Sequence, residues 1–116
     1  APELAVRRLA HGMGYRFRLH RKDLPGKPDL TFPRLRKVVF VHGCFWHGHD
    51  CPRGARVPVR NREYWTRKVA RNMERDKKTQ AALESLGWKS LVAWECEIKD
   101  HARMRRALRR FLGKTA

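Results

Sequence analysis

The sequence has few acidic residues and no long hydrophobic run, and its first residues, Ala1-Pro2-Glu3, are not typical of a signal peptide. Asp and Glu together number 11, against 28 Lys and Arg, which gives a formal net charge of +17 at pH 7. A charge this large repels itself in a small fold unless a polyanion neutralises it, so the composition favours nucleic acid as the partner. No apolar run approaches the ~18 residues that a membrane helix needs. We therefore expect no membrane partner and a cytoplasmic, nucleoid-associated protein.

Cysteine is also scarce, and its number indicates a metal site. Three cysteines would leave one thiol unpaired in a closed set of disulfides, whereas a metal site readily combines three thiolates with one imidazole. The chain has 116 residues and 41% hydrophobic residues, including four Trp and five Phe, which suits one packed domain. No repeat or linker divides it, so we expect a single domain over residues 1–116, acting as a monomer.

Hydrophobic periodicity predicts a small mixed α/β fold. Apolar residues at helical spacing indicate a helix from Pro2 to the glycines near 12–14, a long charged helix over 61–86, and a last helix that begins at Asp100. Alternating or β-branched segments indicate strands at 15–19, 37–42 and 88–94. Prolines and a glycine exclude regular structure at 24–29, where we expect a turn that presents Asp29.

Cysteine and histidine are densest in the segment 42–51. Zinc needs four nitrogen or sulfur ligands in a tetrahedral array, and this loop offers Cys44, Cys51 and either His47 or His49, between which the spacing does not choose. Cys96, after the last predicted strand, is the only other thiol. The alternative is that Cys96 is simply buried and the histidines are solvated. We favour a zinc site that joins the loop to the distant strand.

A second combination of residues involves two predicted strand ends. Asp29 lies at the mouth of one strand and His42 ends the next, so neighbouring strands of a small sheet would bring the carboxylate and the imidazole together. Such a pair suits a site for Mg²⁺ and proton transfer in phosphodiester cleavage. The alternative is that Asp29 is only a turn former after Pro28.

Large aromatic residues form a third combination. Phe45 and Trp46 lie side by side in the glycine-rich loop, and Trp65 begins the long helix. They are either core anchors or wedges that open a base step. The scattered Lys and Arg residues supply phosphate affinity without sequence information.

Five segments together resemble the very short patch repair (Vsr) DNA mismatch endonucleases. They are residues 24–29 (LPGKPD), 39–51 (VFVHGCFWHGHDC), 71–76 (RNMERD), 86–88 (LGW) and 92–96 (VAWEC). The resemblance implies a restriction-endonuclease-like fold, a small mixed sheet flanked by helices, with a structural zinc. It also implies Mg²⁺-dependent nicking of double-stranded DNA beside T:G mismatches left by deamination of 5-methylcytosine, with mismatch-repair proteins as partners.

The same resemblance implies roles for individual residues. The zinc ligands would be Cys44, His49, Cys51 and Cys96. The Mg²⁺ ligands would be Asp29 and the main-chain carbonyl of Val41, with Glu3 near the metal. The catalytic histidines would be His42 and His47, of which His47 activates the attacking water. The aromatic wedge would consist of Phe45, Trp46 and Trp65, and Asn72 would contact the mismatch.

Two departures from the family pattern affect these expectations. Val41 stands where the best-known members carry a threonine, so we expect no hydroxyl to act there. We also expect the family's N-terminal segment to be absent, so the usual recognition sequence is not assumed. Two rival functions remain: a non-catalytic, zinc-containing nucleic-acid-binding module, and a nuclease of the same fold that cuts DNA without a mismatch.

Overall fold

A mixed three-stranded sheet lies at the centre of the fold. The computed structural model describes residues 1–52, 54–55 and 58–113. Along the chain the elements are α1 (Pro2–Gly12), β1 (Leu30–Phe32), β2 (Lys37–His42), α2 (Arg62–Ser85), β3 (Lys89–Trp94), α3 (Glu95–Ile98) and α4 (His101–Leu112). The strand order is β1-β2-β3; β1 pairs with β2 antiparallel and β2 with β3 parallel. This is the predicted class, a small mixed sheet flanked by helices.

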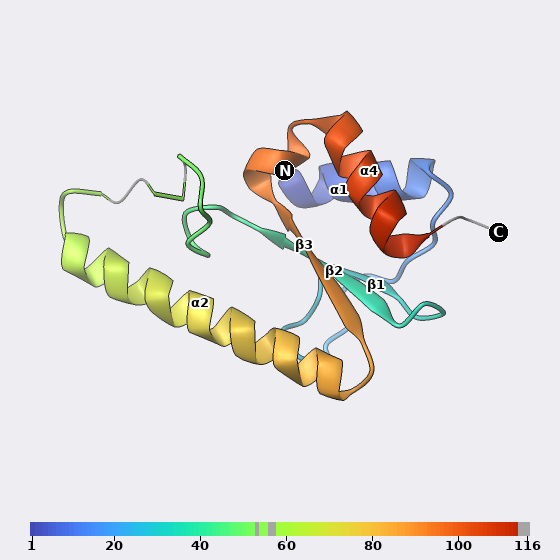
Figure 1. Cartoon of the computed structure of the whole chain (residues 1–116), viewed down its shortest axis with the longest axis horizontal. Helices are drawn as coiled ribbons and strands as arrows, with labels where there is room; N and C mark the ends of the chain where they lie inside the picture. Colours follow the sequence, from blue (N-terminus) through green and yellow to red (C-terminus); the bar gives the residue numbers. More distant parts are fainter. Residues whose placement is uncertain (53, 56–57, 114–116) are drawn as a thin grey trace.

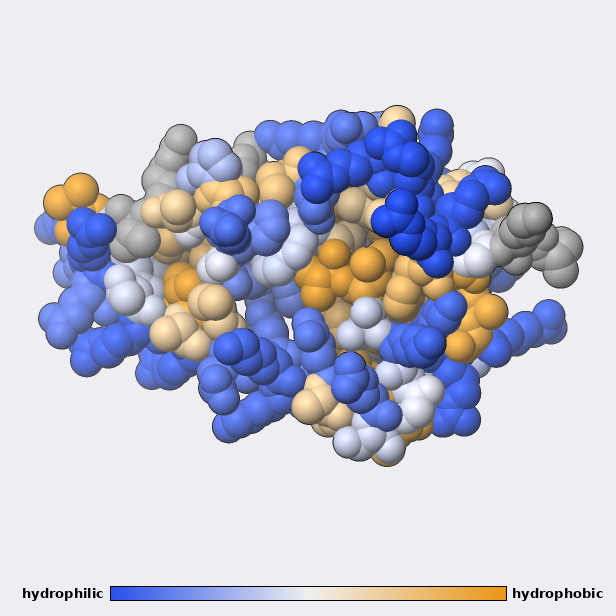
Figure 2. Space-filling model, viewed as in Figure 1, coloured by the Kyte–Doolittle hydropathy of each residue, from blue (hydrophilic) through white to orange (hydrophobic). Residues whose placement is uncertain are grey.

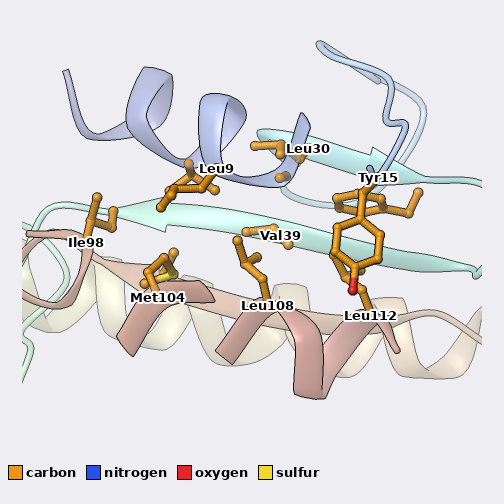
Figure 3. Packing of buried hydrophobic residues seen from close by; sticks show 12 residues of the cluster. Leu9, Tyr15, Leu30, Val39, Ile98, Met104, Leu108 and Leu112 are labelled. Atoms are coloured by element: carbon orange, nitrogen blue, oxygen red, sulfur yellow. The ribbon is translucent and has the colours of Figure 1, made fainter. Parts of the chain in front are cut away.

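The side chains of β2 alternate between two cores, because successive residues of a strand point to opposite faces. Val39 belongs to the larger core, where Leu9 of α1 and Leu108 of α4 point toward it (Figure 3). Val38 and Phe40 pack with Leu83 of α2 in a smaller core. Helices α1 and α4 therefore cover one face of the sheet and α2 covers the other (Figure 1).

The expectation of a strand at 15–19 is wrong. Tyr15 and Phe17 do pack into the larger core, as alternation requires, but only Arg18 pairs, in an isolated bridge with Thr31. At His20 the backbone takes a positive φ of 58°, a conformation that a continuing strand does not adopt. The strand beside β2 is β1, which the sequence analysis missed because three residues carry no readable periodicity.

The observed bounds of the three long helices and the two longer strands agree with the predicted bounds within a residue or two. The side chain of Asp100 caps α4 by accepting a hydrogen bond from the Arg103 amide. Asn61 stands at the start of α2 but makes no capping bond with its side chain. The short helix α3 follows β3 directly and was not expected.

Charge dominates the surface. Hydrophilic residues cover α2 and α4 in the view of Figure 2, and hydrophobic residues show between them. In the part of the chain that the structure describes, no helix combines the length and the apolar character that crossing a membrane requires.

Candidate active site and metal centre

Strand pairing brings Asp29 to the end of β2. Leu30 lies opposite Val39 in the antiparallel pair, so the residue before β1 lies beside the last residues of β2. The Val41 amide donates a hydrogen bond of 2.6 Å to Asp29 Oδ2. The preceding turn packs tightly on α2: a Cβ at Gly26, where φ is +77°, would lie 2.3 Å from Thr79 Cγ2. Glycine at this position therefore lets the turn deliver Asp29 to the site.

An open cavity of about 480 Å³ lies between this turn, the end of β2 and helix α2. Its walls carry two carboxylates, two imidazoles and two cationic side chains. The lining residues are Gly26, Lys27, Asp29, Phe40, Val41, His42, His47, Arg75, Asp76, Thr79 and Gln80. The groups needed to bind a phosphate and to move a proton thus lie in one cavity.

The Asp29 carboxyl is held in an environment that disfavours its charge. Burial is the largest cause that raises its pKa to about 6; the hydrogen bond from Val41 and the charge of Arg7 oppose the rise, while neighbouring Glu3 adds to it. Arg7 Nη2 in turn donates a hydrogen bond of 2.7 Å to Glu3 Oε2. The structure therefore places Glu3, at the start of α1, beside Asp29.

The two predicted catalytic histidines are stacked. The rings of His42 and His47 have centroids 3.7 Å apart and are within 7° of parallel. The pKa of His42 is lowered to about 4. Burial is the largest cause, the charge of His47 contributes to the same shift, and Asp76 opposes it. His42 is therefore neutral at pH 7.

Asp76 completes this group, and the sequence analysis did not single it out as a site residue. His47 Nδ1 and Asp76 Oδ2 are 2.6 Å apart, and one ligand atom each from His42, His47 and Asp76 lies within 4.8 Å of the others. Asp76 is one charge among many on α2, so its pattern gives no signal. The only indication in the sequence is its place at the end of the segment 71–76.

Val41 contributes its backbone to this site. Its amide binds Asp29, while its side chain packs against the larger core under α1 and α4. The valine methyl groups therefore add to the core.

The second cluster consists of three thiols and one imidazole. Single ligand atoms of Cys44, His49, Cys51 and Cys96 lie within 4.8 Å of one another. Cys96, on α3, meets the loop through its amide, 3.4 Å from Cys44 Sγ, and through its sulfur, 3.5 Å from His49 Nδ1. The structure thus brings His49, and not His47, to the thiols.

The environment of these thiols suits a metal centre. The amide of Gly54 donates to Cys51 Sγ at 3.3 Å, and this bond is the largest cause that lowers the Cys51 pKa to about 7. The His49 ring stacks on Trp94, with centroids 4.1 Å apart. Three sulfurs and one nitrogen form one of the ligand sets typical of structural zinc. Residues 53, 56 and 57, which follow this cysteine and histidine segment, lie outside the described residues.

An aromatic cluster lies beyond the zinc-type site. Phe45, Trp46 and Trp65 pack edge to face, with centroid distances of 5.2 to 5.9 Å. Trp46 is 44% exposed, and none of the three belongs to either core. Tyr64, which the sequence analysis did not name, is 5.0 Å from Trp65 by ring centroids. The partly exposed rings of this cluster could therefore contact a ligand.

Asn72 holds this cluster in place. Its Nδ2 donates a hydrogen bond of 2.9 Å to the Trp46 carbonyl, and its Oδ1 accepts one of 3.0 Å from Arg75. Helix α2 is thereby tied both to the aromatic loop and to the cavity that Arg75 lines.

Comparison with known proteins gives one consistent group. A family model described as DNA mismatch endonuclease Vsr matches residues 1–53. Type II nicking enzyme V.XorIIP of Xanthomonas oryzae pv. oryzae is 52% identical over 111 residues, which cover 96% of this chain and 81% of that protein. Type II nicking enzyme V.NmeAIP of Neisseria meningitidis is 42% identical, with 96% and 79% covered. DNA mismatch endonuclease Vsr of Escherichia coli is 38% identical, with 90% and 66% covered.

Proposed function

Because the chain belongs to the Vsr family of DNA mismatch endonucleases and is a DNA-nicking hydrolase, we propose that it nicks one strand of duplex DNA beside a T:G mismatch in a Mg²⁺-dependent reaction. The observation that carries this proposal is the convergence of Asp29, His42, His47 and Asp76 in one cavity beside an exposed aromatic cluster. Deamination of 5-methylcytosine is the source of such mismatches.

The Mg²⁺ site would be formed by Asp29 and the Val41 carbonyl, with Glu3 close by. Mg²⁺ prefers oxygen ligands, and Asp29 receives the Val41 amide on Oδ2, so Oδ1 remains for a cation. Burial is the main cause of the raised pKa of Asp29 and the neighbouring Glu3 carboxyl adds to it, so a bound cation would favour the ionised form. When bound, Mg²⁺ stabilises charge that develops on the phosphate and orients water.

The proton is moved by His47. Asp76 accepts a hydrogen bond from His47 Nδ1 and thereby leaves Nε2 free to take a proton from the attacking water. The water oxygen forms a bond to phosphorus as the ester bond to one sugar oxygen breaks, and that oxygen takes a proton from solvent, which leaves a phosphate and a hydroxyl at the nick. His42 stays neutral and stacks on His47. This stacking fixes the orientation of the His47 imidazole, which acts as the general base. Lys27 and Arg75 line the same cavity and bind the phosphate oxygens.

The cluster of Cys44, His49, Cys51 and Cys96 would hold one structural zinc. Four protein ligands leave no open position for water, so this metal does not take part in the reaction. It ties the loop that carries Trp46 to α3, at the end of β3. A small domain with a limited core gains stability from such a link.

Mismatch recognition would use the aromatic cluster. A T:G wobble pair is easier to deform than a Watson–Crick pair, so a wedge that opens the step meets a smaller cost there. Phe45, Trp46 and Trp65 would supply the wedge. Asn72, next to Trp46, is our candidate for a contact to the mispair. A monomeric state, a cytoplasmic, nucleoid-associated location and partnership with mismatch-repair proteins remain predictions.

The test is a nicking assay on T:G and matched duplexes, each with Mg²⁺ and in magnesium-free buffer that leaves the zinc in place. We expect a nick only on the T:G duplex and only with Mg²⁺, and none by Asp29→Asn. Nicking of both duplexes would favour a nuclease that acts without a mismatch. Binding with no nick under any condition would favour the non-catalytic module.

A further inference from the structure

Helix α4 carries a dense row of arginines on its solvent side. It buries Met104, Leu108 and Leu112, and at about 100° per residue the exposed arc beside them spans roughly 140° and holds four arginines. We call Arg105, Arg106, Arg109 and Arg110 the α4 arginine face; all four are exposed.

Among the described residues, nothing compensates the charges of the α4 arginine face. The helix contains no acidic residue, and within the described part of the chain none of these four side chains makes a hydrogen bond or ion pair. Arg103, by contrast, donates to Glu97 at 3.0 Å. Like charges four residues apart destabilise a helix. The helix dipole favours cations in the last turn, where Arg109 and Arg110 lie, but gives no such gain to Arg105 and Arg106.

The α4 arginine face lies away from the catalytic cavity. The cavity is formed by the turn at 26–29, the end of β2, His47 and α2. Helix α4 covers the opposite face of the sheet (Figure 1), and α4 contributes no residue to the cavity lining. A duplex seated in the cavity would have to bend around the sheet to reach α4, and bending a short duplex so sharply costs several kcal/mol.

The charge density of this face fits a nucleic-acid backbone. Residues 105–110 rise about 7.5 Å along the helix, so the four cations lie on average about 2.5 Å apart along the axis, a spacing between the ~1.7 Å per charge of duplex DNA and the ~3.4 Å per charge of one of its strands. All four are arginines, which bind phosphate oxygens in a bidentate manner. The apolar side of α4 is buried in the core, so the helix cannot insert into a lipid surface as an amphipathic anchor does.

We propose that the α4 arginine face binds the phosphate backbone of a second segment of duplex DNA while the first occupies the catalytic cavity. The contact reads no sequence, because it consists of phosphate contacts alone. The enzyme would then hold two duplex segments on opposite sides of its sheet.

A bridging assay tests this proposal with the full 116-residue chain. A biotinylated T:G duplex of about 15 base pairs, which is about 51 Å long, is immobilised in magnesium-free buffer without chelator and saturated with protein. Capture of a fluorescent matched duplex of the same length is then measured as salt is raised. Wild type should capture it. The variant Arg105→Gln/Arg106→Gln should lose capture, and its slope of log K against log salt for the second duplex should be smaller by about 2, at ~0.9 per phosphate contact.

Three controls make the outcome decisive. Lys22→Gln/Arg34→Gln removes the same charge from exposed turns outside both sites and should capture like wild type. Arg105→Lys/Arg106→Lys should restore most of the capture, because the charge remains. Nicking of the T:G duplex with Mg²⁺ should be unchanged in every variant, which separates this proposal from the proposed reaction. The proposal fails if Arg105→Gln/Arg106→Gln captures the second duplex as wild type does, a result that bridging by a protein dimer would give. It also fails if wild type captures no second duplex, a result expected if the natural ligand of this face is an acidic protein.

Discussion

Replacing Asp29 by asparagine should remove activity and at the same time stabilise the magnesium-free protein. The folded protein raises the Asp29 pKa from its ordinary 3.8 to about 6, so it binds the proton more tightly than the unfolded chain does. The ionised carboxylate therefore destabilises the fold. This penalty is absent below about pH 4, grows between pH 4 and pH 6, and is fully present above about pH 6.

The size of the gain follows from the shift. Two pKa units at 1.36 kcal/mol each give roughly 3 kcal/mol, and screening by solvent at this half-buried carboxyl reduces the expectation to roughly 1–2 kcal/mol. The asparagine oxygen can still accept the hydrogen bond that the Val41 amide donates to Asp29. The variant thus loses the charge and keeps the contact.

The assay is urea unfolding of both proteins in EDTA-free, magnesium-free buffer with zinc retained, at about pH 4 and about pH 8. Asp29→Asn should be more stable at the higher pH and equal at the lower one, and added Mg²⁺ should stabilise only wild type. Asp23→Asn is the control: its hydrogen bond from Arg21 lowers the Asp23 pKa to about 2, so that substitution should not stabilise. The reasoning is refuted if Asp29→Asn shows no gain at pH 8, or the same gain at both pH values.

Three further predictions concern the remaining parts of the site. Cys96→Ala should lose zinc and destabilise the domain, because metal binding and folding are coupled in small metallodomains; metal analysis and a thermal melt check this, and a variant that keeps one zinc per chain would contradict it. His47→Ala should slow nicking by ~10²–10⁴-fold while T:G binding persists; unchanged single-turnover rates would exclude His47 as the base. Trp46→Ala should lose about 1–3 kcal/mol of affinity for the T:G duplex and little for the matched one; equal weakening of both, at one salt concentration and with zinc content verified, would mean that the ring only packs.

Local pattern was enough for the parts of this protein whose residues are close in sequence. The apolar periodicity of α1 and α4 and the β-branched run of β2 identify these elements, because each buries one face or both faces against neighbours. Cys44, His49 and Cys51 lie within one short loop, so their spacing alone pointed to a metal. The charge balance alone indicated a polyanionic partner.

Contacts between distant segments were decided by tertiary structure. The three-residue strand β1 exists because β2 offers it hydrogen bonds, and the segment at 15–19, despite its alternation, leaves the sheet after Arg18. Asp76 meets His47 only because α2 packs across the face of the sheet on which His42 lies. Periodicity reports which face of an element is buried, whereas the partner of a charged side chain on an exposed helix depends on how the layers stack. The sequence therefore determined the longer elements and the loop rich in cysteine and histidine, and the stacking of α2 on the sheet decided which residues meet in the proposed catalytic group.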